Sequence, residues 1–249
     1  MLAEERLSRI CELVATRGTA TVAELASILE TSESTIRRDL DKLDQAHRLV
    51  KVHGGATTLE SAHLTRDLTL PERYCLHADE KRVIAARAAA FIGPDDFVYL
   101  DAGSTVEELI SQLTETRALF ATDSVSHAMA LAARGCRVTV LGGELKSATE
   151  ALVGPDALSA IGRYHFTIGF WGTNGATPEA GYTTPDRNEA MVKQLSMEHT
   201  DRRYVLSDAS KLGATSLVTF AAFDSATFLT AGPVPEGYRT LENVVEVSQ

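Results

Sequence analysis

Short apolar runs alternate with segments of helical length between residues 97 and 230, and this alternation leaves few folds open to the chain. Runs such as Phe97–Leu100 and Tyr204–Leu206 are too short for helices and are typical of strands buried on both faces. Segments of helical length, such as 126–133 and 188–199, lie between the runs. Strands that alternate with helices form a mostly parallel sheet with helices on both faces. The sequence therefore predicts a three-layer α/β domain.

Polar and glycine-rich motifs follow several of these runs. They are Asp101–Thr105, Gly142-Gly143, Gly172–Gly175 and Ser207-Asp208. Ligands of open α/β sheets bind beyond the carboxyl ends of the strands, so the motifs predict a binding site at that edge. In Asp101–Thr105, hydroxyls and the free amides of a helix N-terminus suit a phosphate group. The alternative is an ordinary turn in which a hydroxyl caps the helix.

The first 57 residues predict a different fold. Helical spacing of apolar residues favours helices near 4–17, 21–29 and 33–44, and Thr21 and Glu24 have the spacing of a capping box. Helix, short helix, turn and helix form a helix-turn-helix, whose last helix enters the major groove of DNA. The alternation and glycine pair of residues 49–56 predict a small β-ribbon, the wing. Arg37 and Arg38 would lie on the exposed face of the last helix, either reading DNA or as ordinary surface charges.

Charge and composition exclude several classes of protein. The net charge is −10, but residues 1–57 contain 8 Lys/Arg and 9 Asp/Glu, so most of the acid lies in the rest of the chain. No apolar run reaches the roughly 20 residues of a membrane span, and the acidic N-terminus is unlike a signal peptide, so we expect a cytoplasmic protein. Three widely separated cysteines indicate neither a disulfide framework nor a zinc site, and we expect no metal and no cofactor.

The motif of the third helix and the wing resembles a known family. Residues 32–40, Ser-Glu-Ser-Thr-Ile-Arg-Arg-Asp-Leu, and 52–56, Val-His-Gly-Gly-Ala, closely resemble the signature of DeoR-type bacterial repressors of sugar metabolism. The resemblance implies DNA contacts by the third helix and the wing, and a supporting role in the fold for Asp39. The candidate DNA-binding residues are Ser34, Thr35, Arg37, Arg38, Lys51 and His53. The chain departs from the family at His47, where glycine is usual, and at Arg48.

The second domain is similar to the effector domain of the same repressors, whose fold resembles ribose-5-phosphate isomerase. The resemblance implies that Ser104 and Thr105 hold a phosphate, with Lys193 or Lys211 as its charge partner, and that acidic side chains bind sugar hydroxyls. A surface ion pair between Glu189 and Lys193 is the alternative for that helix. Asp123 replaces the usual asparagine. The candidate effector-binding residues are Asp101, Gly103, Ser104, Thr105, Thr122, Gly142, Gly143, Gly172, Asn174, Asp186, Glu189, Lys193, Asp208 and Lys211.

These interpretations predict a winged helix-turn-helix domain over residues 1–57, a linker over 58–77, a sugar-phosphate effector domain over 78–232 and a C-terminal tail over 233–249. The expected function is repression of sugar catabolism or transport genes, with release from operator DNA by a phosphorylated sugar. Residues 181–186 resemble the stretch found in members of this family that sense fructose- or hexose-type phosphates, and the resemblance implies an effector of that class. The alternatives are an activator of the same type and a sugar-phosphate isomerase-like enzyme. Paired half-sites favour a homo-oligomer, either dimer or tetramer.

Overall fold

The computed structural model describes residues 3–46, 48–52, 54–58, 70–74 and 76–248. The chain divides into two compact units, Met1–Leu68 and Thr69–Gln249, which we describe separately. The predicted linker spans the division. Its described part includes a short helix, α5 (Leu70–Tyr74).

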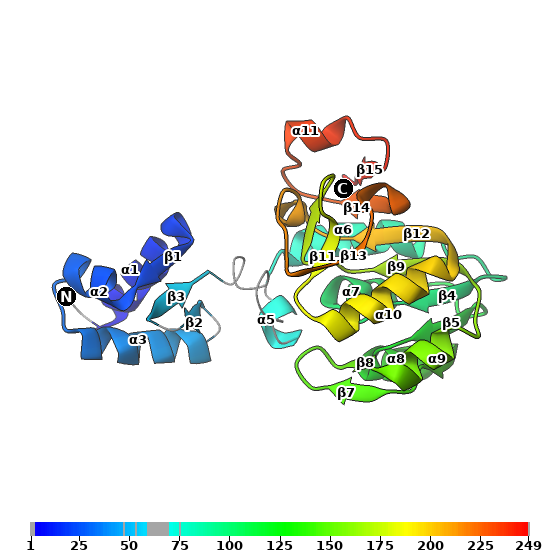
Figure 1. Cartoon of the computed structure of the whole chain (residues 1–249), viewed down its shortest axis with the longest axis horizontal. Helices are drawn as coiled ribbons and strands as arrows, with labels where there is room; N and C mark the ends of the chain where they lie inside the picture. Colours follow the sequence, from blue (N-terminus) through cyan, green and yellow to red (C-terminus); the bar gives the residue numbers. More distant parts are fainter. Residues whose placement is uncertain (1–2, 47, 53, 59–69, 75, 249) are drawn as a thin grey trace. The chain divides into compact units, whose positions relative to one another are not determined.

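The N-terminal unit is a winged helix-turn-helix (Figure 1). Its elements are α1 (Ala3–Arg17), β1 (Thr19–Thr21), α2 (Val22–Ile28), α3 (Glu33–Gln45), β2 (Val50–Val52) and β3 (Gly55–Thr57). The predicted capping box begins α2: the Thr21 hydroxyl accepts from the Glu24 amide at 3.2 Å, and the Glu24 carboxylate accepts from the Thr21 amide at 2.8 Å. Ile10, Leu25 and Leu40 are completely buried in the core that joins the three helices.

The wing contains one strand more than the sequence predicts. The strands pair in the order β1-β3-β2, all antiparallel, so the short strand after α1 completes a three-stranded sheet. Gly55 allows this pairing, because a Cβ at that position would clash with the carbonyl oxygen of Ala20 in β1. Its neighbour Gly54 has φ = +85°, a left-handed conformation that glycine adopts without strain. The glycine pair therefore both turns the ribbon and admits the third strand.

The C-terminal unit is built on a seven-stranded sheet in which every neighbouring pair is parallel. The strand order is β15-β14-β12-β9-β4-β5-β6. The strands are β4 (Phe97–Leu100), β5 (Leu119–Thr122), β6 (Arg137–Val140), β9 (Phe166–Trp171), β12 (Thr200–Leu206), β14 (Thr227–Thr230) and β15 (Val244–Glu246). All six strands predicted between residues 97 and 230 lie in this sheet, so the parallel α/β fold is confirmed.

Helices cover both faces of the sheet (Figure 1). Val98 and Leu100 of β4 pack with α6 (Ala78–Ala89), α7 (Ser104–Ser111) and α8 (Val125–Ala133). Tyr99, between them, points to the other face, where α9 (Pro155–Ile161) and α10 (Arg187–Glu198) pack. Successive strand residues point to opposite faces, so an apolar run such as 97–100 supplies both cores.

Several smaller elements complete the unit. A hairpin is formed by β7 (Glu144–Lys146) and β8 (Ala151–Val153), and a second antiparallel sheet by β10 (Gly175–Thr177), β11 (Gly181–Thr184) and β13 (Val218–Ala221). Two 3-10 turns, η1 (Ala209–Lys211) and η2 (Phe223–Ser225), flank β13. Residues 233–249, expected as a tail, include α11 (Glu236–Arg239) and β15, which extends the main sheet beside β14.

Candidate functional site: a DNA-reading helix and a sensor edge

Three hydroxyl groups gather at the N-terminus of α3. Ser32 is the N-cap, and its side chain accepts a hydrogen bond from the Thr35 amide at 3.2 Å. The hydroxyl oxygens of Ser34 and Thr35 each lie 2.9 Å from that of Ser32. Hydroxyls and amides at a helix N-terminus are frequent phosphate ligands in protein–DNA complexes. The start of α3 therefore presents the groups that hold a helix against a DNA backbone.

Arg37 and Arg38 lie on the exposed side of α3, opposite the buried Ile36 and Leu40. Arg37 pairs with Glu33 at 2.8 Å, but both side chains are more than half exposed. Exposed pairs of this kind contribute little stability, so the Arg37 guanidinium can exchange Glu33 for DNA at small cost. Within the described part of the chain, Arg38 makes no ion pair or side-chain hydrogen bond and already faces solvent.

Asp39 belongs to the core of the unit. Its carboxylate is almost fully buried and accepts hydrogen bonds from the Arg6 guanidinium at 2.6 and 3.3 Å. The pair joins α3 to α1 across 33 residues of sequence. This geometry agrees with the supporting role expected for Asp39.

The wing is tied to the end of α3. The Lys51 amide donates to Asp44 at 2.9 Å, and the Lys51 ammonium pairs with Asp41. Lys51, a predicted DNA contact, therefore already has a carboxylate partner. On DNA, its ammonium group would either contact a phosphate while keeping Asp41 or exchange Asp41 for the phosphate. His53 and the unusual His47 lie outside the residues that the structure describes.

In the C-terminal unit, the turn between β4 and α7 presents open hydrogen-bond donors. The helix begins at Ser104, and the amides of Ser104, Thr105 and Val106 have no acceptor among the described residues. Nor do the hydroxyls of Ser104 and Thr105 form side-chain hydrogen bonds there. A Cβ placed on Gly103 would have no neighbour within 4 Å, so the space beside this turn is open.

A buried ion pair lies at the same edge of the sheet. Asp101 follows β4, and its Oδ2 atom accepts from the Lys193 ammonium of α10 and from the Gly172 amide at 3.0 Å. Its other oxygen, Oδ1, is buried without a hydrogen-bond partner. Burial raises the pKa of the Asp101 carboxyl, and the Lys193 charge opposes that effect. An unsatisfied buried acceptor is costly, and a ligand hydroxyl could satisfy it.

Asp123, the residue that replaces the usual asparagine, is also buried at this edge. Its Oδ1 atom accepts from the Ala102 amide at 2.9 Å and so holds the Asp101–Thr105 turn. Burial and the nearby Asp101 raise the pKa of Asp123 well above its ordinary value, with Glu189 adding to the shift and Lys193 opposing it. Burial and Asp101 therefore favour the protonated form of this side chain, whose hydrogen-bonding groups are similar to those of asparagine.

Glu189 and Lys193 do not form the surface pair that their spacing permits. Both are buried, and each has a partner elsewhere. Glu189 accepts from the Thr149 hydroxyl at 2.6 Å and the Lys146 ammonium at 3.1 Å, whereas Lys193 pairs with Asp101. The surface-pair interpretation is wrong, because two buried charges need close partners and the fold provides one for each.

Other predicted residues shape the edge in different ways. Asp186 caps α10 through the Glu189 amide at 2.9 Å and pairs with Lys146 at 3.1 Å. The Thr122 hydroxyl accepts from the Ser124 amide, and the Asn174 side-chain oxygen accepts from Thr184. Gly143 has φ = +130° and passes close to Val153 of β8. Gly142 has open space beside it.

Asp208 and Lys211 form a second group at the carboxyl end of β12. Asp208 caps the η1 turn through the Ser210 amide at 3.1 Å. Burial raises the pKa of the Asp208 carboxyl, but Lys211, Ser210 and His77 together outweigh it and lower the pKa. In contrast, Asp101, Asp123, Glu189 and Lys193 interact with one another electrostatically. The predicted residues therefore form one central cluster and a neighbouring turn.

Three side chains of the central region were missing from the prediction. Lys146 and Thr149 come from the β7–β8 hairpin, and no local motif marks them. His127 of α8 is buried, and neither ring nitrogen has a hydrogen-bond partner. Burial lowers the pKa of His127 to about 4, so the ring is neutral near pH 7. Its proximity to the backbone of Gly103 places it beside the turn that begins α7.

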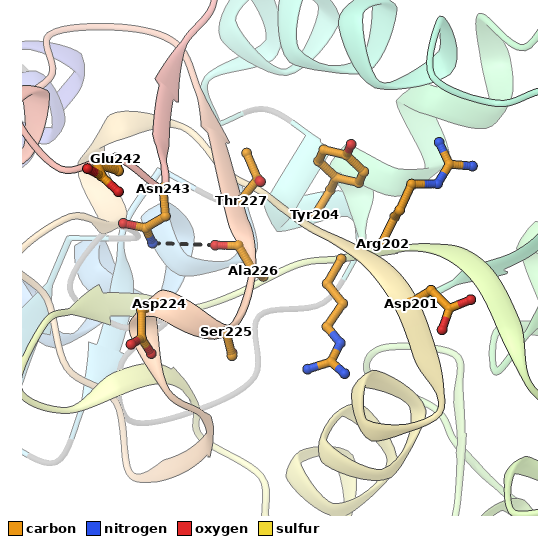
Figure 2. Close-up of a pocket in the computed structure, with 10 residues that line it drawn as sticks. Asp201, Arg202, Tyr204, Asp224, Ser225, Ala226, Thr227, Glu242 and Asn243 are labelled. Atoms are coloured by element: carbon orange, nitrogen blue, oxygen red, sulfur yellow. Dashed lines mark hydrogen bonds between the residues drawn. The ribbon is translucent and has the colours of Figure 1, made fainter.

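A hollow of about 450 Å³ lies near the start of β12 and β14, at the opposite edge of the sheet (Figure 2). Asp201, Arg202, Asp224 and Glu242 are among the residues that line it, and none of the predicted effector residues does. Arg202 is paired with Asp96 at 2.6 Å. The hollow combines acidic side chains with an arginine that is already paired, which gives it no clear ligand chemistry, so the carboxyl edge remains the better candidate site.

Two family descriptions match the chain. The one described as a DeoR-like helix-turn-helix domain matches residues 6–62, and the one described as a DeoR C terminal sensor domain matches residues 76–231. The chain belongs to the DeoR family. This DeoR-family protein is a DNA-binding transcriptional regulator with a helix-turn-helix unit and a sensor unit.

Its similarity to other regulators extends over nearly their whole length. It is 38% identical to the uncharacterized HTH-type transcriptional regulator FruR of Bacillus subtilis, over 92% of this chain and 91% of the relative. It is 36% identical to the HTH-type transcriptional regulator GlpR of Haloferax volcanii, over 93% and 91%. It is 30% identical to the lactose phosphotransferase system repressor of Staphylococcus epidermidis, over 98% of each chain.

Similarity to solved structures is partial. A D-ribose-5-phosphate isomerase in complex with phospho-erythronic acid matches 54% of each chain, with 15% identity and a TM-score of 0.42. The translation initiation factor eIF-2B of Pyrococcus horikoshii matches 86% of this chain and 81% of its own, with 16% identity and a TM-score of 0.44. In the described part of the DeoR-family chain, no helix has the length and apolarity of a membrane span. The same residues contain no cluster of three His, Cys, Asp or Glu side chains suited to a metal ion.

Proposed function

We propose that the protein represses genes of sugar metabolism and leaves its operator when a phosphorylated sugar binds the sensor unit. Membership of the DeoR family identifies the protein as a DNA-binding regulator. The lactose phosphotransferase system repressors among its relatives support both the repressing sign and the sugar class. All three relatives described above are regulators, which favours sensing over turnover.

At the DNA end, we propose that α3 enters the major groove. Ser34 and Thr35 would hold a phosphate, while Arg37 and Arg38 would contact base edges or phosphates. Lys51 and His53 of the wing would contact the backbone beside the groove. Because a recognition helix reads one half-site, we propose a homo-oligomer in which two copies read two half-sites.

At the sensor end, one observation carries the proposal. The N-terminus of α7 offers unbonded amides and the unbonded hydroxyls of Ser104 and Thr105, and it lies next to the buried Lys193–Asp101 pair. Amides at the positive end of a helix dipole and hydroxyl donors suit a phosphate dianion. We propose that the phosphate binds there.

The sugar would extend over the neighbouring acidic side chains. Asp101 has a buried oxygen without a partner, which suits a sugar hydroxyl. In its protonated form, which burial favours, Asp123 can both donate and accept. The remaining residues of this edge stay proposed effector contacts: Gly103, Thr122, Gly142, Gly143, Gly172, Asn174, Asp186, Glu189, Asp208 and Lys211. A hexose or fructose phosphate is the proposed class of effector.

The double substitution Ser104→Ala/Thr105→Ala tests the phosphate site. Hydrogen bonds to charged groups contribute roughly 1.5–3 kcal/mol each, so the variant should bind effector at least about tenfold more weakly. It should still bind operator without effector, because α3 is unchanged, and higher effector concentrations should be needed to release it. An operator-binding assay titrated with hexose phosphates measures both properties.

The matched control is Ser111→Ala, which removes an exposed hydroxyl at the other end of α7, where it is bonded to the Glu108 carbonyl. This variant should be released at the concentration that releases the parent. Equal release of the double variant and the parent would place the phosphate elsewhere. Loss of operator binding in the double variant would show that the two hydroxyls serve the fold.

A further inference from the structure

The sensor unit begins with a short helix that contacts the proposed phosphate site. α5 is the first described element after the connector from the DNA-binding unit, and it packs against α7. The Tyr74 hydroxyl, at the end of α5, donates a hydrogen bond to the Glu107 carboxylate. Glu107 belongs to the first turn of α7, three residues after Ser104. The first described element of the sensor unit therefore contacts the helix end that we propose to hold phosphate.

A second contact ties the same segment to the sensor edge. The buried Lys81 ammonium donates to the Arg73 carbonyl and so holds the end of α5 against α6. His77, with φ = +51°, turns the chain between these two helices. The His77 Nε2 atom lies 3.7 Å from the Asp208 carboxylate at the carboxyl end of β12. α5 and its following turn thus touch the sensor edge at both Glu107 and Asp208.

Charge makes the Tyr74–Glu107 bond sensitive to a phosphate. The Glu107 carboxylate is stabilised by the positive end of the α7 dipole, which is the feature that a phosphate would also use. A dianion bound beside Ser104 would repel Glu107 at close range, and because the Tyr74–Glu107 bond is exposed, solvent would screen part of that repulsion. Tyr74 remains a neutral donor at all physiological pH values, because burial and the nearby Glu107 raise the pKa of its hydroxyl.

We infer that the Tyr74–Glu107 hydrogen bond is a latch that holds α5 in the operator-binding state and opens when an effector phosphate binds at α7. The inference rests on the proposed function, since it requires release by a phosphorylated sugar. A latch closed only in the effector-free state raises affinity for operator and lowers affinity for effector. Linkage then requires that effector weakens operator binding by the same factor by which operator weakens effector binding.

Tyr74→Phe removes the latch and leaves the phosphate ligands intact. The measured quantity is the coupling factor, the ratio of operator Kd with and without saturating probe. We use fructose 1-phosphate, fructose 6-phosphate, glucose 6-phosphate and inorganic phosphate as probes. The coupling factor should fall by roughly two- to fivefold, the scale of a lost contact to a charged group that is exposed to solvent. Operator binding without probe should weaken, and probe binding should be unchanged or tighter.

Glu107→Gln is the second test, because its amide oxygen can still accept from Tyr74 but carries no charge for a phosphate to repel. This variant should also lose coupling, but operator binding should persist in the presence of probe. The two variants therefore reduce coupling with opposite effects on operator occupancy. Tyr238→Phe is the control, since it removes a tyrosine hydroxyl that faces Gly213 in the same unit. It should leave the coupling factor at the parental value.

The outcomes separate the latch from the function on which it rests. If none of the probes releases the parent, the proposed function and the latch fail together. If a probe releases the parent and releases Tyr74→Phe with the same coupling factor, the latch alone is refuted. Weaker probe binding by Tyr74→Phe would also refute it, because that result would place Tyr74 among the effector ligands.

Discussion

Replacing Asp39 would distinguish a structural role from DNA reading within the recognition helix. Asp39→Ala leaves the Arg6 guanidinium without the carboxylate that it contacts at 2.6 Å. Breaking a fully buried pair costs roughly 3–5 kcal/mol, whereas exposed pairs contribute about 0–1 kcal/mol. Asp39 is 4% exposed but Arg6 is 16% exposed, so the guanidinium can partly return to water. We expect the free energy of unfolding of the N-terminal unit to fall by about 2–3 kcal/mol.

Two spectroscopic probes separate the units in the full-length chain. The single tryptophan, Trp171, is buried in the C-terminal unit, so its fluorescence follows that unit alone. Far-UV circular dichroism follows the helices of both. In a urea titration, Asp39→Ala should lower the midpoint of the dichroism change assigned to the N-terminal unit and leave the Trp171 transition unchanged. Asp41→Ala is the matched control, since Asp41 lies on the same helix but is 51% exposed.

Equal stability of Asp39→Ala and Asp41→Ala, with operator affinity lost only in Asp39→Ala, would contradict a structural role for Asp39. That result would assign Asp39 to DNA. If the structural role is correct, adding Arg6→Ala to Asp39→Ala should recover part of the lost stability, because the second substitution removes the unpaired charge. A double-mutant cycle measures that recovery directly.

Three further results are expected. Arg38→Ala should weaken operator binding by roughly 1–3 kcal/mol in a fluorescence-anisotropy assay at constant salt, and unchanged affinity would remove Arg38 from the interface. Asp123→Asn should be at least as stable as the parent at pH 8. The pKa of Asp123 is raised in the folded state, so the parent loses stability as the pH rises above the ordinary pKa of a carboxyl, whereas asparagine does not titrate. The advantage of the variant should therefore disappear as the pH falls toward that ordinary pKa. Since burial lowers the pKa of His127 from 6.5 to about 4, the sensor unit should lose stability as the pH falls from 6.5 toward 4, and His127→Gln should flatten that part of a Trp171 unfolding profile.

The elements that could be predicted are those whose signals are local. The capping box at Thr21 and the apolar spacing of Ile36 and Leu40 are enough to place α2 and α3. The run at 97–100 predicts a strand because both faces of a central parallel strand are buried. These patterns depend only on residues a few positions apart, so they can be recognised in the sequence without knowledge of the fold.

The missing strands depend on distant partners. β10 and β11 contain mostly glycine, threonine and alanine, which give no clear alternation, and β11 finds its second partner in β13, more than 30 residues later. β15 is a strand because β14 provides the edge beside it. A prediction from local periodicity has no access to such pairings, since strand preference depends strongly on packing context.

The same limit applies to the sensor edge. The motif at Asp101–Thr105 marks the turn, but Lys193, the partner of Asp101, is 92 residues away in sequence. Helical spacing pairs Lys193 with Glu189, and that choice fails because both side chains are buried and find partners on other elements. Local spacing identifies neighbours on an exposed helix. Burial instead selects partners by charge and proximity in the fold.

The protonation of Asp123 bears on whether this edge can accept an anion. Asp101, Glu189 and an ionised Asp123 would place three carboxylates around Lys193, and their repulsion would oppose a phosphate at α7. Burial, together with the same repulsion, raises the pKa of Asp123 and so favours its protonated form. Its oxygen still holds the Ala102 amide at 2.9 Å, as an asparagine oxygen could. Because burial and its neighbours favour the protonated form, an acid at this position opposes a nearby phosphate less than an exposed carboxylate would.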